Sequence, residues 1–178
     1  MSGETRAATS SRVAARISSW MIRVPEVWVA LVPAVYTLAT LVPPLLHAAG
    51  RDVAADRVFA FFRLFCHQLP HRTLFLWGHP IAVCARCFAL AASLAIVALL
   101  AGRLWALGFR RVRVPFVLVG VAAVPMALDG FSQLFGLRES TNTLRVLTGV
   151  LLGGMTSLWT VPMVCAAFDD MQQHQEHP

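Results

Sequence analysis

The chain alternates between long apolar stretches and short charged segments. Four apolar stretches stand out, at residues 27–50, 81–107, 114–137 and 146–168. The first contains 24 residues without a charged side chain, and the last contains 23. A helix needs about 20 consecutive apolar residues to cross a bilayer. The pattern therefore predicts four transmembrane helices.

The interruptions within these stretches are compatible with spanning. In the second stretch, 16 uncharged residues separate Arg86 from Arg103, and arginine side chains near helix ends can extend to the membrane interface. The third stretch contains one charged residue, Asp129. Prolines in the first stretch are tolerated in membrane bundles, where neighbouring groups satisfy the freed carbonyls.

The remaining segments are too polar or too short to span. Residues 52–65 mix Asp56, Arg57 and Arg63 with phenylalanine and valine, which is typical of a short helix lying in the interface. We expect a mobile polar N-terminus over residues 1–19, one transmembrane helical domain over residues 20–168, and a polar tail over residues 169–178. The predicted fold is an all-α polytopic membrane protein with about four spans and a short interfacial helix.

Composition supports the same class. Of the 178 residues, 57% are hydrophobic and only 13% are charged, against about 25% charged residues in soluble domains. The net charge of +6 comes from arginine alone. These arginines flank apolar stretches and do not form a polar, aromatic-rich patch, which argues against nucleic acid as a partner. The predicted partner is the lipid bilayer, and the sequence does not identify which proteins, if any, it binds.

Arginine placement predicts the orientation. The N-terminal segment and the loop between the second and third spans each carry four arginines, namely Arg6, Arg12, Arg16 and Arg23, and Arg103, Arg110, Arg111 and Arg113. Four spans place both segments on one side, and the positive-inside rule puts that side in the cytoplasm. We therefore expect a multi-pass protein of the cell inner (plasma) membrane with both termini in the cytoplasm.

Three of the four cysteines lie close together in the sequence, before or at the start of the second span. Cys84 and Cys87 are three residues apart, so they share one face of a helix, and a helix N-terminus favours thiolates. Together with one histidine, they and Cys66 would make a Cys₃His set, the composition of structural zinc sites. The predicted metal ligands are Cys66, His67, Cys84 and Cys87, with His71 or His79 as alternatives to His67. Thiolates would also suit Cu(I) or an iron–sulfur centre.

Two other functions fit the same residues. The layout looks like that of quinone-linked disulfide-forming membrane proteins, with Cys84 and Cys87 as the redox pair, Cys66 as a shuttle and Arg86 beside the thiolate or quinone. A non-catalytic scaffold or transporter subunit, in which Asp129 pairs with arginines, is the third interpretation. The cysteines of the cluster could also be purely structural. Cys165, alone in the fourth span, reads as a small buried hydrophobe.

A second polar segment begins at Asp129 in the third span. An ionised residue at membrane depth costs about 2.5–3.5 kcal/mol and normally pairs inside the bundle, and the candidate partners are Arg86, Arg138 and Arg145. The topology brings this segment and the cysteines to the same extracytoplasmic end, where we expect the site. The predicted polar cluster contains Gln68, Arg72, Arg86, Asp129, Gln133, Arg138, Glu139, Asn142 and Arg145.

The fourth span carries a stripe of small residues. Gly149, Gly153 and Ser157 recur every four positions, so they lie on one helix face. Small residues at this spacing let two membrane helices approach closely. We expect this face to pack against another span.

These motifs resemble a prokaryotic membrane-protein family catalogued as domain of unknown function 2085. The resemblance covers about residues 55–165. Two departures are visible: Thr73 stands where serine is usual, and residues 88–90 replace a Thr-Gly-hydrophobic step. The resemblance implies a membrane protein and no particular activity. The matching residues are Cys66, His67, Gln68, Pro70, Arg72, Cys84, Arg86, Cys87, Asp129, Gly130, Gln133, Arg138, Glu139, Ser140, Asn142, Arg145, Thr148 and Gly149.

Overall fold

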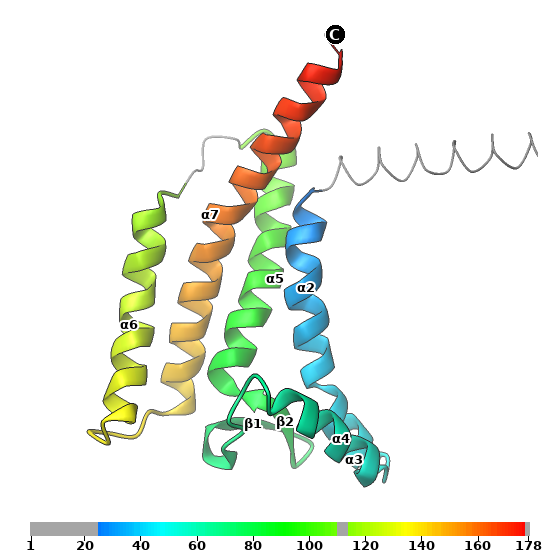
Figure 1. Ribbon diagram of the computed structural model, residues 1–178, viewed down its shortest axis with the longest axis vertical. Coiled ribbons are helices and arrows are strands. Elements are labelled where there is room, and N and C mark those ends of the chain that lie inside the picture. The colour runs from blue at the N-terminus through cyan, green and yellow to red at the C-terminus, as the bar shows by residue number, and fades with distance from the viewer. Residues whose placement is uncertain (1–24, 110–113, 177–178) are drawn as a thin grey trace, which may run out of the picture.

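The computed structural model describes residues 25–109 and 114–176, and it is a helical bundle with a small layer at one end (Figure 1). Four helical segments are long and apolar enough to cross a membrane: Pro25–Ala48, Ala85–Ala106, Phe116–Leu134 and Asn142–Met171. The prediction of a mainly helical protein with four spans is confirmed. The expected mobile segment 1–19 lies outside the described residues.

The first span is built from two helices in series, α2 (Pro25–Thr40) and α3 (Val42–Ala48). The helical hydrogen-bond pattern is interrupted at Leu41, just before Pro43 and Pro44. Neither proline has an N–H to donate, so the carbonyls one turn earlier lose their helical partners. Proline placement therefore sets the break between α2 and α3.

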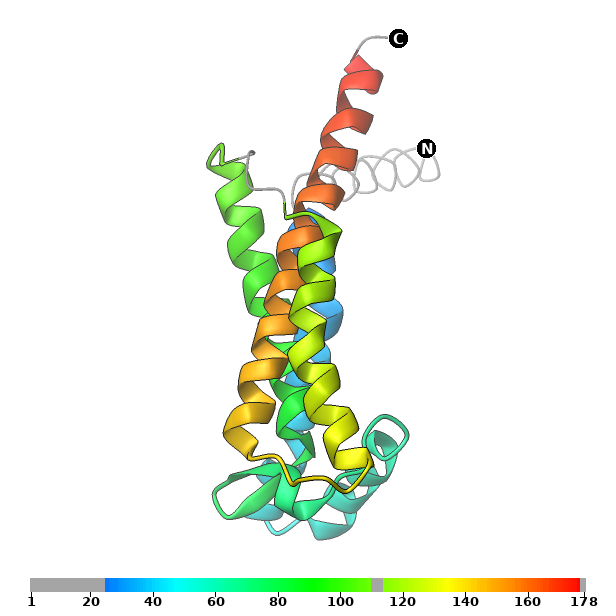
Figure 2. The same cartoon turned by 90° about the vertical axis from the view of Figure 1, so that its left-hand side faces the viewer.

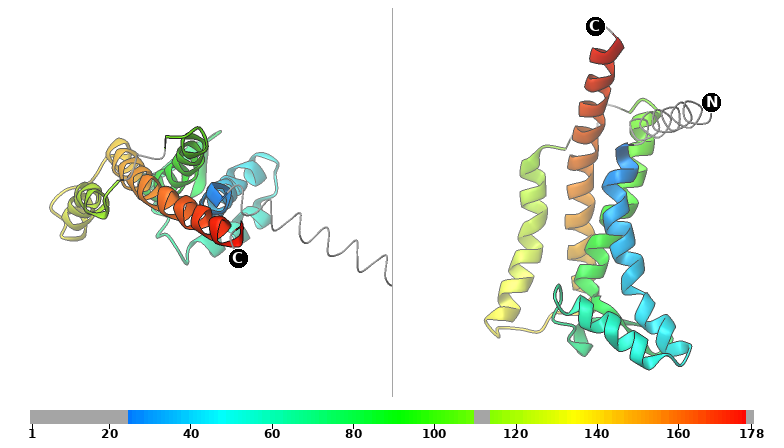
Figure 3. Two further views of the ribbon diagram at one scale, coloured as in Figure 1. Left: turned by 90° about the horizontal axis from the view of Figure 1, so that it is seen from above. Right: turned by 45° about the vertical axis from the view of Figure 1, so that its right-hand side comes forward.

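The centre of the bundle is the contact between α5 (Ala85–Ala106) and α7 (Asn142–Glu176). Seen end-on, α2 lies against α5, and α6 (Phe116–Leu134) lies at the opposite edge beside α7 (Figure 3). A Cβ atom on Gly149 would come within 2.8 Å of the Arg86 carbonyl, and one on Gly153 within 2.5 Å of the Leu90 carbonyl. The small-residue stripe is thus the packing face that the sequence predicted.

The layer at the end of the bundle contains elements that lie across the spans (Figure 1). It consists of α4 (Asp52–Phe62), the short 3₁₀ helix η1 (Pro70–Arg72), and the antiparallel strands β1 (Thr73–Leu76) and β2 (His79–Cys84). We call this end, where α5 and α7 begin and α6 ends, the cysteine end. The interfacial helix was predicted to reach residue 65, and it ends at Phe62.

The hairpin of β1 and β2 was not predicted. Its turn residues Trp77 and Gly78 both have positive φ values, 52° and 80°, as a type I′ turn requires. Residues 81–84 were assigned to the second span, and they instead form the end of β2. Their side chains at 81–83 are buried. A short buried apolar strand cannot be distinguished from a helix by periodicity alone, which explains the error.

The fourth span is longer than its apolar stretch. Helix α7 begins at Asn142 and continues to Glu176, so most of the expected polar tail 169–178 is helical. Figure 2 shows the C-terminal part of α7 extending past the neighbouring helices. Cys165 lies in this helix, buried among Ala98, Trp105 and Val161, in agreement with its interpretation as a small hydrophobe.

Candidate functional site

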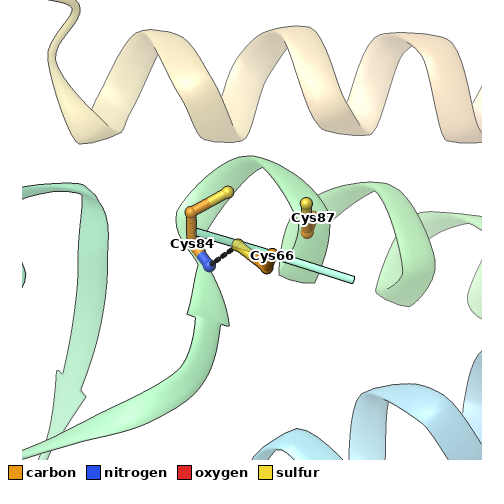
Figure 4. Close-up of side chains that lie close together, drawn as sticks. All are labelled: Cys66, Cys84 and Cys87. Atoms are coloured by element: carbon orange, nitrogen blue, oxygen red, sulfur yellow. Dashed lines mark hydrogen bonds between the residues drawn. The ribbon is translucent and has the colours of Figure 1, made fainter. Parts of the chain in front are cut away.

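The three clustered cysteines converge at the cysteine end. Cys66 follows the turn after α4, Cys84 ends β2 and is the N-cap of α5, and Cys87 lies in the first turn of α5. Because β2 runs directly into α5, the Cys-x-x-Cys segment bends around Cys66 (Figure 4). The three sulfur atoms all lie within 4.8 Å of one another. We call these residues the three-thiol group.

Cys66 is the best-stabilised sulfur of this group. Its Sγ accepts a hydrogen bond from the backbone N–H of Cys84 at 3.2 Å. The thiols of Cys84 and Cys87 lower the pKa of Cys66 well below its usual range, helped by the backbone N–H groups of Gln68 and Cys84 and opposed by burial. Hydrogen bonds to the charged form favour that form, so the surroundings of Cys66 favour its thiolate.

Gln68 holds the Cys66 loop in place. Its backbone has a φ of 53°, an uncommon conformation for a residue other than glycine. Its side-chain Nε2 donates to the carbonyls of Phe59 and Ala82, both at 2.8 Å. These bonds join α4 to β2 across the loop. Gln68 was predicted as part of the polar cluster, and in the structure it bonds to these two carbonyls.

The predicted histidine ligand is not in the three-thiol group. Among the described residues, the group of potential metal ligands contains three sulfurs and no histidine. His67 is exposed, although it lines the same cavity as the cysteines. His71 accepts a hydrogen bond from Arg72 Nε at 3.1 Å, and His79 stacks on His47 with 5.3 Å between ring centroids.

Asp129 is the centre of a second cluster. Its side chain is 2% exposed and forms ion pairs with Arg86 and with Arg138, the latter at 2.7 Å between Nη2 and Oδ1. Gln133 Nε2 donates to Asp129 Oδ2 at 3.0 Å. The carboxylate thus joins α5, α6 and the α6–α7 loop. We call Arg86, Asp129, Gln133, Arg138 and Arg145 the arginine–aspartate cluster.

Arg145 has neutral partners. Its guanidinium donates to Gln133 Oε1 at 3.0 Å and to Asn142 Oδ1 at 2.8 Å. Asn142 Nδ2 donates in turn to the Thr73 carbonyl at 3.3 Å, which links α7 to the hairpin. Of the three candidate partners of Asp129, Arg86 and Arg138 bind the carboxylate, and Arg145 does not. Glu139, also expected in the cluster, is exposed and forms no ion pair with the residues that the structure describes.

One cavity of about 620 Å³ connects the two clusters. The three-thiol group lines it, and so do residues of the arginine–aspartate cluster and the loop around Gln68. Charged lining comes from Arg72, Arg86 and Arg145, and apolar lining from Phe65, Leu69, Ala127, Phe131 and Leu134. The buried Nε of Arg86 has no hydrogen-bond partner among the described residues.

Sequence reasoning missed the parts of the site that depend on the hairpin. The hairpin places Cys84 against Cys66, and its carbonyls at Thr73 and Ala82 accept bonds from Asn142 and Gln68. Trp77-Gly78 is a weaker turn signal than Asn-Gly. It is nevertheless the signal in the sequence that could have revealed the hairpin.

Comparison with known proteins gives a consistent picture. The family model described as "Predicted membrane protein (DUF2085)" matches residues 66–159. The chain is 37% identical over 106 residues to an uncharacterised protein of Methanocaldococcus jannaschii, covering 60% of this chain and 67% of that protein. It is 35% identical over 92 residues to an uncharacterised protein of Methanothermobacter thermautotrophicus, covering 52% of this chain and 80% of that protein. No solved structure gives a significant match. Since the family model spans more than half of its length and both polar clusters, the chain belongs to the DUF2085 family of predicted membrane proteins.

Proposed function

We propose that this membrane protein binds one thiophilic metal ion, preferably zinc, through Cys66, Cys84 and Cys87. The observation that carries the proposal is the mutual approach of three sulfur atoms within 4.8 Å. A zinc ion with Zn–S bonds of about 2.3 Å holds its sulfurs about 3.8 Å apart in a tetrahedral site. Only a small contraction separates the present arrangement from that geometry. The N–H donated to Cys66 Sγ is the type of outer contact that orients a thiolate ligand.

The fourth ligand would come from the cavity. Zinc sites with three protein ligands keep a position for water or another small ligand. His67 lines the same cavity, so a rotation of its exposed side chain offers the alternative of a closed Cys₃His site. A site with four protein ligands would be structural. A site with three would leave one coordination position of the metal facing the cavity, where a small molecule could bind.

A second candidate is oxidation of the Cys84 and Cys87 thiols to a disulfide by a quinone. The cavity beside Cys84 and Cys87 has apolar walls and contains Arg86, which suits a lipid-soluble molecule with carbonyl acceptors. In this reaction two thiols lose two electrons and two protons, the S–S bond forms, and the quinone becomes a quinol.

One experiment separates the two functions. The full chain is purified in detergent without oxygen or chelator, and its metal content is measured beside a thiol count with and without reductant. Metal binding predicts about one zinc ion per chain and cluster thiols that become alkylatable after chelation. Absence of metal, together with two thiols that appear only after reduction, would support the redox function. Absence of both would leave the scaffold or transporter interpretation.

A further inference from the structure

The cavity at the cysteine end has an uncompensated positive charge. Three guanidinium groups line it, those of Arg72, Arg86 and Arg145, and among the described residues no carboxylate does. Arg145 is 2% exposed, and its hydrogen bonds go to neutral oxygens. Buried charges are normally paired, because removing them from water costs several kcal/mol each. Apart from the Cys66 sulfur, the described lining contains no group that favours a negative charge.

The neighbouring carboxylate does not balance this positive charge. Asp129 already binds Arg86 and Arg138, so one carboxylate is shared between two cations. A zinc ion held by three thiolates would contribute one net negative charge. With Arg138 included, four arginines would still exceed these two negative charges. Without the metal, a Cys66 thiolate and Asp129 would also give two negative charges, so the excess remains.

The depth of the cavity indicates where an anion would come from. Helix α5 has 22 residues and is about 33 Å long, close to the thickness of the hydrocarbon core of about 30 Å. Its first turn carries Arg86, so this guanidinium lies near the level of the lipid headgroups. Lipid phosphates are the anions present at that level. Guanidinium groups suit such phosphates, which they bind through charge-assisted and often bidentate hydrogen bonds.

The apolar walls indicate an amphiphile. Phe131 and Leu134, on the last turns of α6, are 58% and 76% exposed, and Phe65 faces the same cavity from the loop after α4. A volume of about 620 Å³ is within the range of about 300–1,000 Å³ for ligand sites. It is much larger than an inorganic phosphate needs.

From these observations we propose that the cavity binds the phosphate group of an anionic membrane lipid, with the acyl chains lying over Phe65, Phe131 and Leu134. Arginines from η1, α5 and α7 line the cavity from three elements, which suits the several oxygens of a phosphate. The site is independent of the proposed metal centre, although the two ligands would share one cavity.

The test uses delipidated full-length protein in detergent. Phosphatidylglycerol or phosphatidylcholine is added, and lipid retention by native mass spectrometry is read beside the thermal unfolding temperature. We expect phosphatidylglycerol to be retained and to stabilise the protein, and phosphatidylcholine to do so far less. Arg72→Gln and Arg145→Gln should each reduce retention about tenfold, the loss expected for one charge-assisted contact. If Arg145→Gln does not fold, the half-buried Arg72 decides the outcome.

Two controls make the test specific. Arg63→Gln also removes one positive charge from the cysteine end of the bundle, at an exposed position that does not line the cavity. This variant should retain the lipid as well as the unaltered protein does. Cys84→Ser should lose metal and keep the lipid, so failure of the metal proposal and failure of this one can be distinguished. Equal retention of both lipids, or equal losses in the Arg63 and Arg72 variants, would overturn the proposal. So would full stabilisation by inorganic phosphate alone, which would mean a soluble anion, or stronger stabilisation by ubiquinone.

Discussion

Asp129 shows how much a single residue can determine in a membrane bundle. Its position in an apolar stretch was enough to predict a cationic partner, because an isolated carboxylate there would be too costly to keep ionised. The sequence offered three arginines and could not rank them. Which arginines bind Asp129 depends on the surrounding loop and helix. The α6–α7 loop turns Arg138 back onto Asp129, whereas Asn142 and Gln133 bind Arg145. Loop geometry of this kind leaves no periodic signal.

The Asp129–Arg86 pair should show strong energetic coupling. Asp129→Asn leaves two guanidinium groups without their carboxylate, and removing one partner of a buried pair costs about 3–5 kcal/mol. In a double-mutant cycle, Asp129→Asn combined with Arg86→Gln should therefore be much less destabilising than the sum of the single variants. The measurement is thermal unfolding in detergent, read together with metal content.

The matched cycle uses Arg145→Gln, since Arg145 is buried nearby and bonds to Gln133 and Asn142. We expect a smaller coupling there. Equal coupling in the two cycles would contradict the observed pairing, and additive losses in both would mean that the clusters act independently.

The four cysteines should respond unequally to substitution. Cys84→Ser and Cys87→Ser each remove one of the three converging sulfurs and should abolish the bound metal or the disulfide. Cys165→Ser changes a buried side chain near the opposite end of the bundle and should leave both intact. Metal analysis and thiol counting provide the measurement. The same loss in all three variants would defeat the assignment of the three-thiol group.

At the scale of elements, apolar length was a reliable guide and local pattern was not. The four spans follow from stretches of about 20 residues that have no other stable arrangement in lipid. The boundaries were wrong where apolar character continues into another element. Residues 81–84 are as apolar as the helix that follows them, yet they pair with β1. It was thus predictable that the three clustered cysteines lie at one end of the bundle. The convergence of Cys84 on Cys66 was not, because it depends on the hairpin.

The contact between α5 and α7 can be tested with adjacent glycines. A Cβ atom at Gly153 would meet the Leu90 carbonyl at 2.5 Å, whereas at Gly154 the nearest atom is Val97 Cγ2 at 3.7 Å. Gly153→Ala should therefore destabilise the protein by about 1–3 kcal/mol, the usual cost of overpacking. Gly154→Ala should be neutral or slightly stabilising, because alanine favours a helix. Thermal unfolding of the two variants checks this, and similar effects would argue against the close approach.

At the scale of the whole molecule, the bundle has two chemically different ends. The cysteine end carries both polar clusters and the transverse layer of α4, η1 and the hairpin (Figure 1). The other end contains a buried apolar group around Ala30, Trp105 and Val161. Of the arginines that predict the orientation, Arg103 is among the described residues and the others lie outside them.

We expect both chain termini in the cytoplasm and the cysteine end outside it. A phosphatase reporter, active only outside the cytoplasm, should be inactive when fused after Pro178 and active when inserted at the exposed hairpin turn of Trp77 and Gly78. A fluorescent reporter that needs the cytoplasm should give the opposite result at the C-terminal fusion. An active phosphatase at the C-terminus would invert the orientation and place the thiols in a reducing compartment.

The length of α7 has a consequence for distances measured from the membrane. Its 35 residues extend about 52 Å, whereas the hydrocarbon core accounts for about 30 Å. Up to about 20 Å of helix therefore projects beyond the hydrocarbon core, on the side away from the cysteine end. A fluorophore attached near its end would report a fixed height above a labelled bilayer surface. The distance from the fluorophore to the bilayer surface would decrease if the bundle tilted. It could therefore be used to compare the tilt of the protein in membranes of different thickness.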